Sequence, residues 1–208
     1  MQTSNNSHLR KQQVLLTCLV LGPLFQLIGD SLWVTHDYPY SWSIWREASY
    51  LFLIPAGILL FKKVEGRSVQ WAIIACALYI TGCFGSATMM PLFRLGAFYP
   101  IERPNEFPAI VQTVLDKKLF AASLFLPGLC FPVSLVLFGF LFLRYRLLPA
   151  VLSVAFCVSG MLFWIGNAGE VNAILVIGDA LLLVVFCWFG YVNFSNSARA
   201  DLSLSTGG

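Results

Sequence analysis

The chain has 208 residues, of which 58% are hydrophobic and 11% are charged, and its formal net charge is +3. A soluble domain carries about 25% charged residues, so this chain has too few to cover a water-facing surface, and the bilayer is its expected solvent. The modest net charge gives no support for a nucleic-acid partner.

The apolar residues are grouped in stretches of membrane-spanning length. A transmembrane helix needs about 20 mainly apolar residues, and six stretches qualify. We therefore expect an all-α, multi-pass membrane bundle in which residues 13–195 form a single transmembrane domain, between a cytoplasmic tail at 1–12 and a polar tail at 196–208. The spans are expected near 13–35, 45–63, 69–93, 119–143, 147–166 and 170–192.

The distribution of Lys and Arg predicts the orientation. If both termini share one side, that side carries eight of these residues and the other carries five, which together account for all 13. The loop "KKVEGR" at 62–67 is the most basic short link. Because cytoplasmic loops are enriched in Lys and Arg, we expect both termini in the cytoplasm, in a plasma membrane or a bacterial inner membrane.

The first span carries a polar stripe. Gln26, Asp30 and Trp33 recur at helical spacing and so share one face. Asp30 lies five residues from the expected outer end, about 7 Å deep at 1.5 Å per residue. Arg94, at the outer end of the third span, is the cation expected to pair with it.

The long outer link, 94–118, combines a proline-rich first half with an amphipathic second half. Residues 107–118 place apolar side chains on one helical face, which predicts a short helix lying at the membrane interface. A stiff connector explains this pattern better than a lid over a pocket.

The sixth span contains the most unusual residue. Asp179 lies nine residues inside it, about 13 Å deep, where an acid costs roughly 2.5–3.5 kcal/mol on insertion scales. No Lys or Arg is expected at that depth, so Asp179 must be protonated, hydrogen-bonded, hydrated or paired with a group that reaches down to it. Asn172 shares its face. The hexapeptides "LIGDSL" (27–32) and "VIGDAL" (176–181) place a glycine before each buried acid, which indicates two similar helix contacts.

Few other residues suggest chemistry. The two histidines do not support a haem or a zinc hydrolase, and the six cysteines form no CxxC motif. We therefore expect neither a metal nor a cofactor.

The sequence predicts an outward-facing polar pocket. Its expected lining is Gln26, Asp30, Trp33, Arg94, Asn172 and Asp179. Binding or transport of a small or cationic solute fits best.

Two alternatives stay open. One is an intramembrane enzyme in which Asp30 and Asp179 act as catalytic acid and base on a lipid or isoprenoid. The other is an accessory membrane subunit whose acids pair across helices. Besides the lipid bilayer, the partners compatible with the sequence are a small-molecule or lipid-like ligand, a protein partner and further copies of the chain.

Overall fold

The computed structural model describes residues 2–36, 39–98, 116, 118–169 and 171–205. Within these ranges the elements are six helices: α1 (Gln2–His36), α2 (Pro39–Glu65), α3 (Val69–Phe98), α5 (Lys118–Arg144), α6 (Ala150–Ala168) and α7 (Asn172–Ser205). Each helix contains a stretch long and apolar enough to cross a membrane: Gln13–Val34, Ser41–Glu65, Val69–Pro91, Leu126–Arg144, Ala150–Asn167 and Asn172–Asn193. The prediction of an all-helical, multi-pass membrane protein is confirmed.

The first residues of α2 and α6 differ from the predicted boundaries. Helix α2 begins at Pro39 and not at residue 45, because proline is favoured at the first helical position and the Tyr, Trp and Ser residues that follow continue the helix. Helix α6 begins at Ala150, after Pro149 at the N-cap position, and not at residue 147. The interfacial helix expected over 107–118 falls, apart from residues 116 and 118, outside the described residues.

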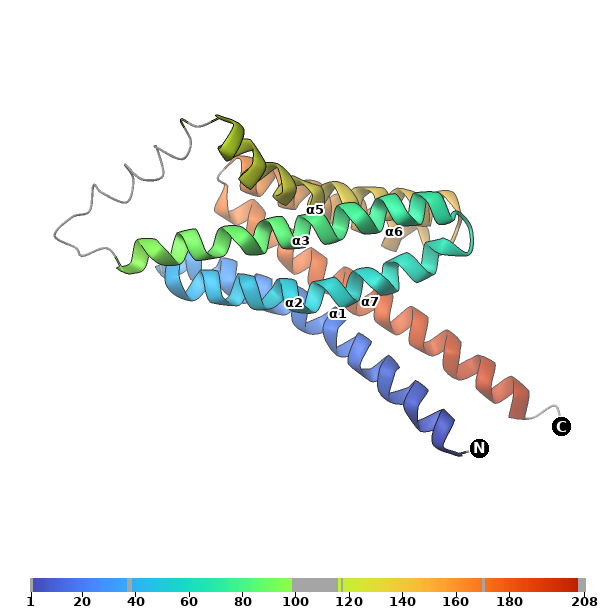
Figure 1. The fold of residues 1–208 in the computed structure, drawn as a ribbon. Helices are drawn as coiled ribbons and strands as arrows, with labels where there is room; N and C mark the ends of the chain where they lie inside the picture. Colours follow the sequence, from blue (N-terminus) through green and yellow to red (C-terminus); the bar gives the residue numbers. More distant parts are fainter. Residues whose placement is uncertain (1, 37–38, 99–115, 117, 170, 206–208) are drawn as a thin grey trace.

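The helices form a closed ring in chain order. Each helix packs on its neighbours in the chain, and α1 packs on α7 to close the ring. Figure 1 shows the first turns of α1 and the last turns of α7 projecting from the same end of the bundle. The opposite end, where α1 stops and α7 begins, is called the α1 C-terminal end below.

Glycines bring the helices of the ring close together. At every contact around the ring, a glycine lies where an added Cβ would be 3.1 Å or less from the neighbouring helix. Small residues of this kind allow close backbone approach between membrane helices. In ring order from the α1–α2 contact to the α7–α1 contact, these glycines are Gly22, Gly57, Gly82, Gly139, Gly166 and Gly190.

Aromatic side chains fill much of the interior of the ring. Phe131 on α5 contacts the rings of Tyr50, Tyr79 and Phe163, with centroids 6.4, 5.2 and 5.4 Å away. Nearer the end from which the termini project, Phe142 packs against three further aromatic rings. The buried side chains of Gln26, Asp30, Arg46 and Asp179 lie toward the α1 C-terminal end.

Candidate functional site

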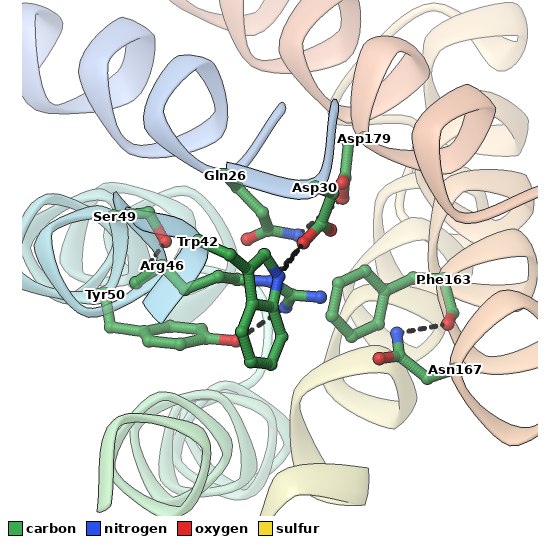
Figure 2. Close-up of polar contacts among 9 residues, drawn as sticks. All are labelled: Gln26, Asp30, Trp42, Arg46, Ser49, Tyr50, Phe163, Asn167 and Asp179. Carbon is green, nitrogen blue, oxygen red and sulfur yellow. Dashed lines mark hydrogen bonds and ion pairs between the residues drawn. The ribbon is translucent and has the colours of Figure 1, made fainter. Parts of the chain in front are cut away.

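Two donors from α2 hold Asp30 of α1. Its Oδ1 atom accepts a hydrogen bond of 2.7 Å from Nε1 of Trp42 and an ion-paired one of 2.6 Å from Nε of Arg46. Trp42 and Arg46 are four residues apart, so they share one face of α2. Gly29 permits the close approach, since a Cβ there would lie 3.3 Å from the Trp42 carbonyl oxygen. Figure 2 shows both α2 side chains converging on the carboxyl group.

Helix α7 brings a second acid to the same place. Gln26, one helical turn before Asp30, donates a 2.6 Å hydrogen bond from Nε2 to Oδ1 of Asp179. The carboxyl groups of Asp179 and Asp30 face each other within side-chain hydrogen-bonding reach. Gly178 backs onto α6, where an added Cβ would lie 3.1 Å from the backbone nitrogen of Phe163. The two similar hexapeptides thus each contribute a close helix contact and one acid.

Gln26, Asp30, Arg46 and Asp179 form what we call the carboxylate cluster, and protein encloses it almost completely. The two acids and Gln26 are 0% exposed and Arg46 is 3% exposed. Gln26 lies eight residues before Val34 and Asp179 lies seven residues after Asn172, so both are about 11–12 Å from the ends of their spans. Asp30 is nearer the end of its span, but α2 and α7 cover it.

Arg46 is also surrounded by aromatic groups. Its Nη1 donates a 2.9 Å hydrogen bond to the hydroxyl of Tyr50, and that hydroxyl interacts in turn with the side chain of Ser86 on α3. Its Cζ atom lies 5.7 Å from the ring centroid of Trp42 and 5.3 Å from that of Phe163 on α6. Cation–π attraction of this kind strengthens when the cation is desolvated, so the aromatic groups help to hold a charge far from water.

The cluster leaves several oxygen atoms without a donor. Among the described residues, the buried side-chain atoms with no hydrogen-bond partner are Gln26 Oε1, Asp30 Oδ2, Asp179 Oδ2 and the hydroxyl of Tyr79. Three of these four atoms belong to the carboxylate cluster. A buried polar atom without a partner costs about 1–3 kcal/mol, so this arrangement favours a positively charged or hydrogen-donating occupant.

The structure brings together some of the predicted lining and not the rest. Gln26, Asp30 and Asp179 meet, and Trp33 packs against Trp42 with ring centroids 4.9 Å apart. Asn172 is exposed at the first turn of α7, because it lies seven residues nearer the helix end than the acid whose face it shares.

The expected cation is replaced by another. Arg94 was expected to pair with Asp30, but Arg46 makes that ion pair, and the side chain of Arg94 lies outside the described residues. Arg46 is not predicted from the sequence because it lies at the outer edge of the expected second span, 45–63, where its charge counts with those of the outer loops. The signal that could have found it is the row Trp42, Arg46 and Tyr50 at intervals of four, on a helix that starts at Pro39.

No family model, curated protein or solved structure matches the chain. Within the described residues, no three His, Cys, Asp or Glu side chains gather closely enough to hold a metal ion. The charges and geometry of the carboxylate cluster are therefore the features that point to a function.

Proposed function

We propose that this membrane protein is a carrier or binding protein for a small solute with a single positive charge, or for a solute coupled to a proton. The carboxylate cluster is its binding site. Asp179 and Asp30 would supply the negative charge, and Gln26 would orient the occupant through its free carbonyl oxygen.

The observation that carries this proposal is the charge of the enclosed cluster. Two ionised carboxylates and one guanidinium give a net charge of −1, and the three side chains Gln26, Asp30 and Asp179 each keep an oxygen atom without a donor. Buried charges are normally paired and hydrogen-bonded. A single added positive charge would balance the cluster and satisfy these acceptors together.

The expected orientation places this site in the outer half of the membrane. Arg46 is buried inside the bundle, so without it the Lys and Arg count becomes eight on the side of the termini and four on the other side. This stronger asymmetry supports cytoplasmic termini, and therefore a cluster nearer the external face.

The accessory-subunit alternative has its own supporting observation. The acids pair across helices, Asp30 with Arg46 on α2 and Asp179 with Gln26 on α1, which a purely structural cluster would also do. The enzyme alternative has less support, because the rings of Trp42 and Phe163, which could stabilise a cationic intermediate, already flank the guanidinium of Arg46.

Native mass spectrometry of protein purified in mild detergent tests the proposal. A co-purified amine or monovalent cation that is lost in Asp179→Asn and retained in Glu65→Gln would support the carrier. Glu65 is a suitable control because it is exposed at the end of α2. A co-purified protein would favour the accessory subunit, and a co-purified isoprenoid would favour the enzyme. If either one co-purifies equally with the wild type and with Asp179→Asn, the proposed site is overturned.

A further inference from the structure

We infer from the geometry that the carboxyl groups of Asp30 and Asp179 share one proton, and that this proton is the charge the carrier exchanges with the outside. The second part of this inference rests on the proposed function, whereas the first part rests only on the arrangement of the cluster.

The hydrogen bonds leave one position for the proton. Oδ1 of Asp30 already accepts from Trp42 and Arg46, and Oδ1 of Asp179 accepts from Gln26. The Oδ2 atoms of both acids have no donor, although the two groups lie within hydrogen-bonding reach. Two ionised carboxylates can only accept. A proton on either Oδ2 would make that oxygen a donor, and one hydrogen bond could then satisfy both atoms.

Charge counting gives the same number of protons. Among the described residues, the titratable groups that face the pair are Arg46 and, beyond it, Tyr50, both on α2; α6 contributes the ring of Phe163. A neutral tyrosine adds no charge, so one guanidinium neutralises one carboxylate. The second carboxylate lies 0% exposed beside the first, and like charges this close favour a single shared proton.

Loss of the proton would act on the contact between two helices. A proton taken up from water forms an O–H bond on one carboxylate, and its release returns the proton to water with no transfer of electrons. Release leaves two negative charges facing each other between α1 and α7, away from water. Their repulsion would push apart the contact that closes the ring, and so admit solvent or solute to the cluster.

Infrared spectroscopy of the purified full-length protein counts such protons directly. A protonated carboxyl group gives a C=O stretch that is separate from the carboxylate bands and shifts in ²H₂O. We expect one such band at neutral pH, with its area normalised to the amide band. Asp30→Asn and Asp179→Asn should each abolish this band. In either variant the remaining carboxylate and the guanidinium of Arg46 together have no net charge, so no proton is needed. Glu65→Gln should retain it.

Arg46→Gln provides a reciprocal test. Removal of the guanidinium leaves two acids without a cation, so the band area should double if this variant folds; if it does not fold, the two Asn variants decide. Absence of the band in the wild type would overturn the inference, and so would its persistence in Asp30→Asn, which would mean that Asp179 is protonated without help from its neighbour. Loss of the band on addition of sodium at constant pH would assign the site to a metal cation instead. The bands recorded without sodium do not depend on finding a solute, so a failed binding experiment would count only against the proposed function.

Discussion

Arg46 on α2 and Asp30 on α1 form an ion pair of 2.6 Å that is enclosed by protein, with side chains 4% and 0% exposed. This pair sets one guanidinium against one of two neighbouring carboxyl groups. The charge of the second acid is therefore the charge in the cluster that still has to be balanced.

Removing one partner of this ion pair should destabilise the folded protein. Arg46→Gln removes the cation and leaves Asp30 buried without it, which typically costs about 3–5 kcal/mol. The double variant Asp30→Asn, Arg46→Gln should recover much of this loss, because neither charge remains. Unfolding by a denaturing detergent, followed in all three variants and the wild type, measures the coupling; additive losses would mean that the two residues stabilise the protein independently.

Two buried tyrosines provide a matched comparison. The Tyr50 hydroxyl accepts a hydrogen bond from Arg46, so Tyr50→Phe should destabilise the protein by about 1–3 kcal/mol, the cost of a buried donor left unpaired. The Tyr79 hydroxyl has no partner among the described residues, so Tyr79→Phe should leave stability unchanged or raise it, while its ring keeps its contact with Phe131. Equal losses in the two variants, measured by thermal unfolding, would contradict this assignment.

The close contact of α3 with α5 can be tested at Gly82. An added Cβ there would lie 2.2 Å from the backbone nitrogen of Phe131 on α5, and backbone cannot move aside as a side chain can. Gly82→Ala should therefore lower the unfolding temperature and the yield of folded protein. Gly66→Ala, where nothing lies within 4 Å, should change neither. An unaffected Gly82→Ala variant would show that α3 and α5 are farther apart than described.

Single cysteines in a cysteine-free background test the orientation. Placed at Ser4 and Ser205, they should resist an impermeant thiol reagent in intact cells, and one at Asn105 should react, because the excess of Lys and Arg assigns the termini to the cytoplasm. Labelling at the two terminal positions without labelling at Asn105 would invert the topology and put the cluster in the cytoplasmic half.

Hydropathy was sufficient to predict the six helices, because a spanning helix must be both long and apolar. Helical periodicity also predicted that Gln26 and Asp30 share a face, and depth singled out Asp179. The order of helices around the ring could not be predicted, because hydropathy gives the length of a helix and periodicity gives its faces, and neither identifies its neighbour. The contact of α1 with α7, which brings Gln26 to Asp179, therefore came only from the structure.

Arg46 shows a second limit of the sequence. A charged residue beside a run of Tyr, Pro, Ser and Trp has the hydropathy of a loop, and its burial depends on a partner 16 residues earlier in the chain. Asn172 shows the opposite error, because this residue was predicted to line the pocket and is exposed. It lies on the same helix face as Asp179 but at the end of the helix.

The measurement that tests the central claim most directly is a thermal-shift titration of wild type and Asp179→Asn with small amines and monovalent cations. A ligand that binds only the folded state stabilises it by about 2.7 kcal/mol at 100 times its dissociation constant. We expect at least one such cation to raise the unfolding temperature of the wild type. Asp179→Asn, which keeps the shape of the side chain, should unfold near the wild-type temperature without ligand and should not respond. If Asp179→Asn instead unfolds at a much lower temperature, or responds to the same cation as the wild type does, the cluster is a structural pairing of helices and not a binding site.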